Sequence, residues 1–321
     1  MDDCTICLGY DSIHAMVLNA KSLIILSFFP VFLNIDYSNQ KQTEADSFKI
    51  QLAAIVVNDL DSSFMWYQNT LGFEVEKPIE NYPDYNLRLA FLKKNGFHLE
   101  LVEKAGSIPL QEAQPENTNL GGVLKLGFLV DDLDGLYNKL SKDDEVELLT
   151  TIGDLPEMDL SLKWPKRYFL ITDPDGNLVQ IFSYDDDKLQ GNDFIPWLAM
   201  ITVMDLDQAI EWYQQNLGFE FHKSVGEPGN RRAILERNNN VLELFEPSDV
   251  KVLNEFPLNT DIQGFRKLAF KTMNFDQVVN ALQTSSASFV MNPNSIDSKW
   301  ASKATIVKDP EGNWIQIYAA K

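Results

Sequence analysis

The chain contains the same pattern twice, and this duplication constrains its fold more than any other feature. Residues 58–77 read NDLDSSFMWYQNTLGFEVEK, and residues 204–223 read MDLDQAIEWYQQNLGFEFHK. Later in each copy, DPDGNLVQIF at 173–182 matches DPEGNWIQIY at 309–318. Self-similarity at a fixed spacing indicates repeated structural units that pack on one another. The chain is therefore predicted to fold as a tandem of two similar halves.

The limits of the duplication define the predicted domains. The first copy covers 48–185 and the second covers 193–321, with the polar stretch DDDKLQGND (185–193) between them. A length of 321 residues agrees with about two domains. Residues 1–47 precede both copies and are interpreted as a leader or signal-like segment followed by a linker.

A weaker repeat lies inside each half. GFLVDDLDGLYNKL (127–140) resembles AIVVNDLDSSFMWY (54–67), and AFKTMNFDQVVNAL (269–282) resembles MITVMDLDQAIEWY (200–213). Each half is thus expected to contain two similar modules, which gives four modules in all.

Each module is predicted to run as one strand, one helix and three strands. In the first module, the β-branched run Leu52–Val57 is typical of a strand. Asp59 follows as a helix N-cap, Tyr67 belongs to a helical repeat of apolar residues, and Gly72 suits the positive φ that ends a helix. The remaining strands are expected at 73–76, 87–92 and 97–102. The predicted fold class is therefore α+β, built from four βαβββ modules.

The charge balance excludes one class of partner. Lys and Arg number 27 and Asp and Glu number 47, which gives a formal net charge of −20. Nucleic-acid affinity comes largely from Lys and Arg that displace counterions from phosphates, so no nucleic-acid partner is expected. The two cysteines, Cys4 and Cys7, both lie at the N-terminus, so no disulfide framework holds the body together.

The N-terminal segment contains an apolar run, SLIILSFFPVFLNI at 22–35. This run is shorter than the roughly 20 residues that span a bilayer. It follows Lys21 and is similar to the apolar core of a signal peptide, more so if translation begins at Met16. Residues 16–35 therefore favour export to the periplasm or cell envelope. An extra buried or membrane-associated helix in a cytoplasmic protein is the alternative.

The order of the repeated motifs resembles the vicinal oxygen chelate superfamily, which includes glyoxalases, bleomycin resistance proteins and extradiol dioxygenases. The resemblance rests on V-x-D-L ahead of W/F-Y and LGF, then L-E-L, a V-D-D-L start of the second module, and D-P-D/E-G-N ahead of Q-I. It covers nearly all of 48–321 and implies paired modules whose curved sheets enclose clefts. Many members hold a divalent metal there through His or Gln, Glu, His and Glu, from the first and last strands of each module.

At these four ligand positions the sequence departs from the family. Both halves read Leu, Glu, Lys and Gln: Leu52, Glu100, Lys125 and Gln180, then Leu198, Glu243, Lys267 and Gln316. Leucine has no donor atom and a protonated lysine repels a cation. The resemblance therefore implies that the usual metal and any other cofactor are absent from these positions, although a metal with unusual ligands stays open.

The same residues allow a positive interpretation. Our hypothesis is that an ammonium–carboxylate pair replaces the metal in each cleft with a glutamine beside it, namely Lys125 or Lys267 facing Glu100 or Glu243, with Gln180 or Gln316. Partly buried charges need partners, and such a pair supplies them. The pair either takes part in ligand binding or is only structural.

Three further residues are candidates for the cleft. His98 lies two residues before Glu100, so both side chains share one face of a strand and could act as a general base or as half of a metal site. The second half has Val241 at the place of His98. Arg88 and Arg232 lie on predicted third strands and could hold an anionic ligand; arginines exposed on the strand surface are the alternative.

These observations favour a protein that binds a small molecule in a cleft without the usual metal. The alternative is an enzyme of the superfamily, a lyase, isomerase or dioxygenase, either metal-dependent or assisted by Lys125 and Glu100, with His98 as a further catalytic candidate. A structural protein that reuses the sheets for assembly is a third possibility. The modules are expected to pair closely, either within a monomer or in a homodimer.

Overall fold

The computed structural model describes residues 48–109, 112, 119–155, 163–184, 194–248, 250–251, 261–285, 287–296 and 301–320. The segment 16–35 and the two cysteines, on which the export and cysteine predictions depend, lie outside these residues. Among the described residues, no helix combines the length and apolar character needed to cross a membrane.

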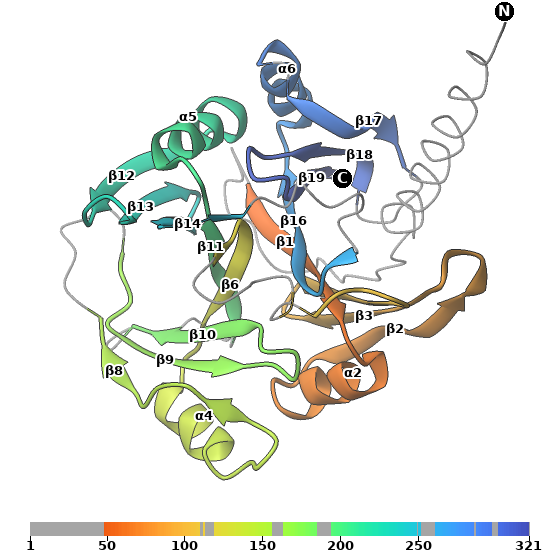
Figure 1. The fold of residues 1–321 in the computed structure, drawn as a ribbon, viewed down its shortest axis with the longest axis vertical. Helices are drawn as coiled ribbons and strands as arrows, with labels where there is room; N and C mark the ends of the chain where they lie inside the picture. The colour runs from red at the N-terminus through yellow and green to blue at the C-terminus, as the bar shows by residue number, and fades with distance from the viewer. Residues whose placement is uncertain are drawn as a thin grey trace, which may run out of the picture.

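The described chain forms four βαβββ modules, as the sequence predicts (Figure 1). Module 1 comprises β1 (Lys49–Val57), α2 (Leu60–Asn69), β2 (Glu74–Tyr82), β3 (Leu87–Lys94) and β4 (Phe97–Lys104), with a 3-10 turn at Pro83–Tyr85. Module 2 comprises β6 (Gly122–Leu129), α4 (Leu133–Leu140), the short strands β7 (Glu147–Leu148) and β8 (Gly153–Asp154), β9 (Arg167–Thr172) and β10 (Leu178–Ser183).

The second half repeats this order. Module 3 comprises β11 (Ile195–Thr202), α5 (Leu206–Leu217), β12 (Glu220–Val225), β13 (Asn230–Arg237) and β14 (Asn240–Pro247). Module 4 comprises β16 (Gly264–Thr272), α6 (Phe275–Thr284), β17 (Ser288–Ser295), β18 (Ala301–Lys308) and β19 (Trp314–Ala320). A two-stranded ribbon of β5 (Asn119–Leu120) and β15 (Val250–Lys251) links the halves.

The local signals in the sequence act as expected. The Asp59 side chain accepts a hydrogen bond from the Ser62 amide at 3.0 Å, and Asp205 accepts one from the Gln208 amide at 3.0 Å. Both bonds satisfy amides that the first helical turn leaves free. Gly72 has φ +70°, the left-handed conformation predicted for it at the end of the first helix.

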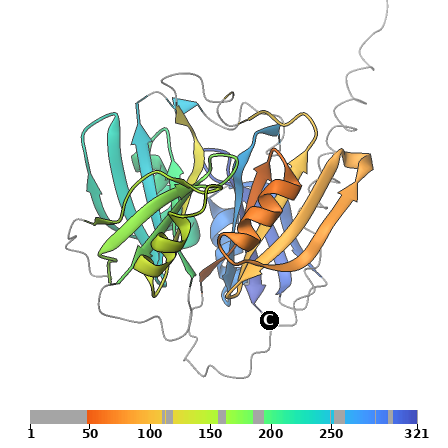
Figure 2. The same cartoon turned by 90° about the horizontal axis from the view of Figure 1, so that it is seen from below.

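The sheets combine modules from different halves of the sequence. One sheet has the strand order β17-β18-β19-β16-β1-β4-β3-β2, so it joins modules 4 and 1. The other has the order β12-β13-β14-β11-β6-β10-β9-β7, with β8 paired to β9, so it joins modules 3 and 2. We call them the 1–4 sheet and the 2–3 sheet; Figure 2 shows them side by side. The ranges 48–185 and 193–321 therefore each contribute one module to each sheet.

The two halves meet at antiparallel central strands. In the 1–4 sheet β1 pairs with β16, and in the 2–3 sheet β6 pairs with β11. Buried amide side chains join the halves as well. Asn240 accepts a hydrogen bond from the Ile50 amide at 3.0 Å and donates one to the Phe48 carbonyl at 2.7 Å. Asn313 accepts a hydrogen bond from the Val123 amide at 3.2 Å. The first strand of each module in the first half is therefore bonded to an asparagine of the second half.

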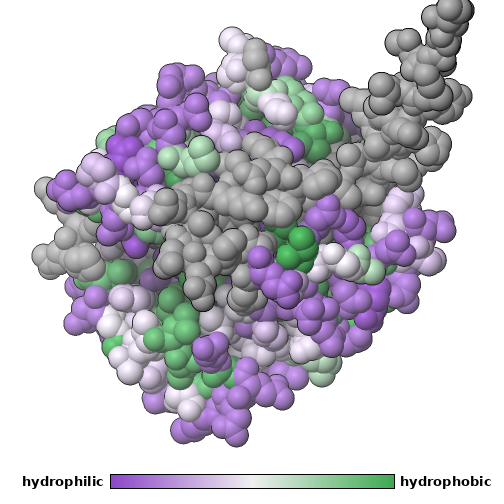
Figure 3. All heavy atoms as spheres, viewed as in Figure 1, coloured by the Kyte–Doolittle hydropathy of each residue, from purple (hydrophilic) through white to green (hydrophobic). Residues whose placement is uncertain are grey.

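One hydrophobic core connects all four helices and one face of each sheet. It includes Ile55 of β1, Phe128 of β6 and Tyr213 of α5, all of them buried. The opposite face of each sheet carries a smaller cluster of its own, which includes Leu52 in the 1–4 sheet and Leu198 in the 2–3 sheet. Hydrophilic residues prevail on the outer surface seen in Figure 3, in keeping with the acidic composition.

Two buried tyrosines tie the modules of one half together. The Tyr67 hydroxyl on α2 donates to Asp173 at 2.8 Å, and the Tyr213 hydroxyl on α5 donates to Asp309 at 2.7 Å. Each aspartate opens the D-P-D/E-G-N turn of the other module in its half. Burial raises the pKa of Asp173 to about 6, although bonds from Asn177 and Tyr67 oppose the shift. Both tyrosines therefore stabilise the fold and do not form a surface for ligand binding.

The third residue of this turn differs between the halves and predicts a difference in pH dependence. Both Asp175 oxygens accept hydrogen bonds, from the Asn58 amide and the Ser63 hydroxyl, each at 3.0 Å. Its counterpart Glu311 accepts one from the Met204 amide at 3.0 Å, and its other oxygen has no hydrogen-bond partner among the described residues. Burial raises the pKa of Glu311 to about 7.

We expect Glu311→Gln to become more stable relative to the native chain as the pH rises. Between about pH 4.5 and 7 the unfolded carboxyl has lost its proton while the folded one keeps it, so native stability falls with rising pH. Equilibrium unfolding at pH 5 and pH 8 should show a relative gain of about 2 kcal/mol for the variant at the higher pH. Burial raises the pKa of Asp175 as well, so Asp175→Asn follows the same direction with pH. This comparison variant should nevertheless be less stable than the native chain at pH 8, because it removes an acceptor of a hydrogen bond. A pH-independent effect of Glu311→Gln would contradict the assignment.

Candidate functional site

The residues at the four ligand positions come together crosswise. The 1–4 sheet assembles Leu52, Glu100, Lys267 and Gln316, and the 2–3 sheet assembles Leu198, Glu243, Lys125 and Gln180. The sequence suggested one group within each half. In the structure, each group takes its leucine and glutamate from one half and its lysine and glutamine from the other. Both groups still read Leu, Glu, Lys and Gln, because the two copies match at these positions. We call each group a tetrad, and the sheet face that carries it, opposite the helices, the tetrad face.

The first tetrad contains a buried ion pair. Lys267 Nζ lies 2.6 Å from Glu100 Oε2, and the two side chains are 2% and 1% exposed. Ala54 lies between them in the sheet, since it is opposite Lys267 on β16 and opposite Glu100 on β4. A two-strand separation is about 10 Å, and the two long side chains cover it by extending toward each other over the residue between them. The small Ala54 leaves room for them to do so.

The second tetrad contains a more open version of the same pair. Lys125 Nζ lies 3.1 Å from Glu243 Oε2, with side chains 10% and 12% exposed. Met200 takes the place of Ala54, opposite Lys125 on β6 and Glu243 on β14. Arg232 donates to the second oxygen of Glu243 at 2.9 Å, and its own side chain is 44% exposed. One carboxylate thus faces two cations, one of which reaches solvent.

The two glutamates differ in how many of their carboxylate oxygens have hydrogen-bond partners. Glu100 Oε1 is buried and has no hydrogen-bond partner among the described residues, whereas both oxygens of Glu243 are paired. Burial raises the pKa of Glu100 above its usual range, and the attraction of Lys267 only partly opposes this effect. A buried carboxylate with one free oxygen needs a partner such as water or a ligand.

His98 lies on the tetrad face with Glu100, as strand alternation predicts. Its Nδ1 is 2.7 Å from Glu76 Oε2 on β2, and both side chains are almost fully buried. The sequence analysis missed Glu76. Its signal was the alignment of FEVEK with FEFHK, in which Glu76 and His222 occupy the same position.

The two candidate arginines lie on different faces of their strands. Arg88 pairs with Asp61 at 2.7 Å and Glu103 at 3.1 Å, on the helix side of β3. Its structural counterpart is Arg231, which makes the same kind of bridge in module 3. Arg232 is one residue further on and therefore points to the tetrad face, because successive residues of a strand alternate. Arg88 does not join a tetrad, and Arg232 does.

Aromatic side chains line both tetrad faces. Around the second tetrad, Phe182 and Trp197 are buried with ring centroids 5.0 Å apart. Four further aromatic residues pack against them and are partly buried: Trp164, Tyr168, Tyr184 and Phe245. The cluster around the first tetrad holds the buried rings of Phe91, Trp314 and Tyr318, together with several alanines. Two surface hollows of about 410 and 380 Å³ lie over α5 and at the start of α6, lined by other residues.

Most of the chain matches one known protein family. Residues 49–181 and 195–317 match the family model for the Glyoxalase/Bleomycin resistance protein/Dioxygenase superfamily. The chain belongs to this superfamily. The recognition from sequence motifs is thereby confirmed, together with the tandem arrangement. A search of curated proteins gave no match.

Solved structures of the superfamily share its fold. Glyoxalase I from Zea mays is similar with a TM-score of 0.60 and 19% sequence identity, covering 85% of this chain and 93% of that one. A putative dioxygenase from Bacillus subtilis is similar with a TM-score of 0.57 and 13% identity, covering 85% of each chain. At such identities the likeness concerns the fold alone.

The tetrads of this superfamily member offer few donors to a divalent ion. In each one, the leucine has none, the ammonium is bound to the glutamate, and one amide oxygen and one carboxylate remain. Protein sites for such ions use three or four donors. The side chains of either tetrad therefore do not fit the superfamily's usual metal.

Replacing each tetrad lysine by the isosteric methionine tests the energetics of the pairs. We expect Lys267→Met to lower the free energy of unfolding by about 3–5 kcal/mol, because it removes the cation that is bonded to the buried Glu100. Lys125→Met should cost only about 1 kcal/mol, because Arg232 still pairs with the more accessible Glu243. Denaturant unfolding provides the measurement. The double variant Lys267→Met/Glu100→Leu should recover most of the loss, and equal losses in both single variants would contradict this picture.

Proposed function

We propose that this chain binds a small planar organic anion on the tetrad face of the 2–3 sheet, without a divalent metal at the superfamily's usual position. The observation that carries the proposal is the placement of Lys125 and Arg232 around the single carboxylate of Glu243, on a face lined by partly buried aromatic rings. The ion pair takes the place of the metal as the charged element of the site.

The charge distribution supports an anionic ligand. The chain as a whole carries a formal charge of −20, yet two cations meet one carboxylate at this point. The guanidinium of Arg232 already lies over the Phe245 ring at 4.6 Å, and the side chain is partly exposed to solvent. A planar, always charged guanidinium is well suited to bind a carboxylate through two parallel hydrogen bonds.

The lining supports a planar ligand. The partly buried rings of Trp164, Tyr168 and Tyr184 offer apolar surface on which a flat molecule can stack. Two buried polar atoms nearby on this sheet, Trp164 Nε1 and Gln180 Oε1, have no hydrogen-bond partner among the described residues. A buried donor and acceptor without partners are costly unless a ligand or water satisfies them. Since one chain supplies both modules of each tetrad, we propose that a monomer suffices for binding.

A matched pair of ligands tests the proposal. We expect 2-naphthoate to bind the full chain more tightly than the neutral 2-naphthamide, in titration calorimetry with and without EDTA. Arg232→Gln should weaken 2-naphthoate binding about tenfold, which corresponds to about 1.4 kcal/mol, and leave 2-naphthamide unchanged. Lys125→Met should act in the same direction. Arg88→Gln is the control, because Arg88 lies on the helix side of its sheet.

Two results would count against this function. Equal affinity for the acid and the amide would remove the role of the cations. Loss of 2-naphthoate binding on addition of EDTA would show that a metal, and not the ion pair, holds the ligand.

A second candidate function concerns the 1–4 sheet, where unpartnered polar atoms favour acid–base chemistry. Glu76 Oε1, Glu100 Oε1 and both polar atoms of Gln316 are buried without hydrogen-bond partners among the described residues. Burial raises the pKa of Glu100, which makes its carboxylate a stronger base for proton transfer. Deuterium exchange next to the carbonyl of a panel of hydroxyketones, followed by NMR, tests it. Glu100→Gln should abolish exchange and Glu243→Gln should not.

A further inference from the structure

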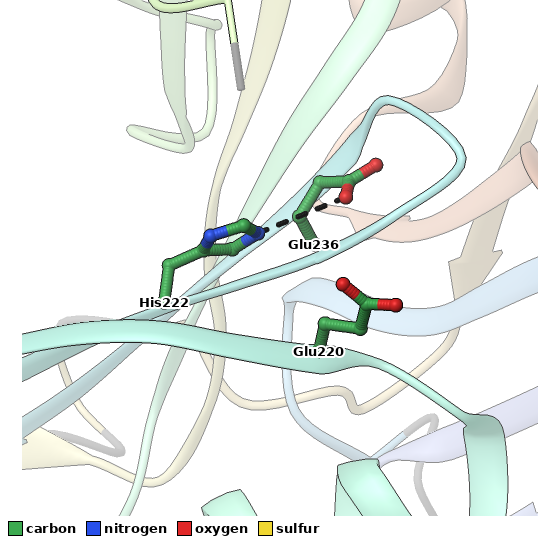
Figure 4. Close-up of side chains that lie close together, drawn as sticks. All are labelled: Glu220, His222 and Glu236. Carbon is green, nitrogen blue, oxygen red and sulfur yellow. Dashed lines mark ion pairs between the residues drawn. The ribbon is translucent and has the colours of Figure 1, made fainter. Parts of the chain in front are cut away.

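Three metal-ligating side chains converge at one edge of the 2–3 sheet, on the edge strand β12 and its neighbour β13. Glu220 and His222 on β12 and Glu236 on β13 place one ligand atom each within 4.8 Å of one another. His222 Nε2 is 3.7 Å from Glu236 Oε2, which is longer than a hydrogen bond. Figure 4 shows the imidazole directed toward Glu236, with the carboxylate of Glu220 on the same strand as His222.

The duplication shows that this cluster lacks a positive charge that its counterpart has. In module 3 Glu220 lies directly opposite Glu236 across β12 and β13. At the equivalent register of module 1, Glu74 lies opposite Lys93. Like charges directly opposite each other destabilise a strand pair, whereas opposite charges stabilise it. Module 3 therefore has an unfavourable pair at the register where module 1 has a favourable one.

The neighbouring positions have changed in the same direction. His222 takes the place of Glu76. In both copies the strand register shifts between the two residues that flank this position. In module 1 Glu76 bonds to His98, but the counterpart of His98 is Val241, so the histidine has moved to the edge strand. The result is one imidazole and two carboxylates in one place, without the lysine that neutralises the first copy.

We propose that Glu220, His222 and Glu236 bind a divalent first-row transition ion, for which Zn²⁺ is the probe. One nitrogen and two carboxylate oxygens match the donors such ions take, and three protein ligands leave a coordination position open. Ligand atoms in a tetrahedral zinc site are about 3.4 Å apart, so only small side-chain rotations are needed from the present separations. The ion neutralises the opposed carboxylates.

This site is separate from the second tetrad but lies on the same face of the sheet. Arg232 and Glu236 are four residues apart on β13, and both point to the tetrad face, which puts them about 13 Å from each other. Glu220 is exposed and Glu236 partly exposed, so an ion can enter from solvent. The position is two strands away from Leu198, where the superfamily would place a ligand.

The test measures Zn²⁺ binding by the full chain after removal of metals with EDTA and buffer exchange. Calorimetry should show one equivalent of Zn²⁺ bound and a raised melting temperature. His222→Ala should weaken binding at least 100-fold. Glu236→Lys recreates the charge pair of module 1, so it should also abolish binding while raising the melting temperature of the metal-free protein.

Glu243→Gln is the matched control, because it alters the tetrad and leaves the edge cluster intact. It should keep full Zn²⁺ affinity. The proposal is overturned if the folded native chain binds no Zn²⁺ at 100 µM, if His222→Ala and Glu236→Lys bind as the native chain does, or if Glu243→Gln loses the ion. The first of these outcomes leaves the anion site at Arg232 untouched, since that site is tested in EDTA.

Discussion

The antiparallel pairing of β1 with β16 and of β6 with β11 is the contact on which the rest of the structure depends. Without it, each module would leave the edge of its first strand unpaired, with a row of buried amides and carbonyls that lack partners. The pairing joins residues about 200 positions apart, since Ala54 faces Lys267. It also brings together the strands that carry each tetrad, so neither half of the sequence can form its ion pair alone.

The two lysine–glutamate ion pairs have the same arrangement, but the residues around them make one pair closed and the other accessible to solvent. Lys267 reaches across the small Ala54 to Glu100 in a closed environment. Met200 occupies the equivalent place between Lys125 and Glu243, and Arg232 completes the latter pair from the next strand. An isolated buried pair contributes little net stability, because desolvation offsets its attraction. The open pair keeps one cation available to solvent.

Much of this fold follows from the sequence, because its signals are local. The helix cap at Asp59 and the left-handed Gly72 act within a few residues of the chain, and the structure confirms both. The residue types of the tetrads were also predicted. Their grouping was not, because Lys125 and Lys267 occupy equivalent positions in matching copies, and only long-range strand pairing decides which glutamate each one meets.

The arginines illustrate a second limit of the sequence. Arg88 and Arg232 stand at similar places in the two third strands, but the true counterpart of Arg88 is Arg231. A shift of one residue moves a side chain to the other face of a strand, so an alignment without register cannot assign faces. Arg232 belongs to the tetrad face for this reason alone.

Duplication left two copies of each position, and the differences between copies separate what the fold requires from what it does not. The tyrosine–aspartate bond to the D-P-D/E-G-N turn occurs in both halves, so it belongs to the common framework. Lys93 and Glu236 occupy one register position with opposite charge, which the framework tolerates in either form. In module 3 the opposed carboxylates of Glu220 and Glu236 cost stability that the Glu74–Lys93 register of module 1 does not. The cation that we propose for this cluster offsets that cost, because it places a positive charge between the two carboxylates.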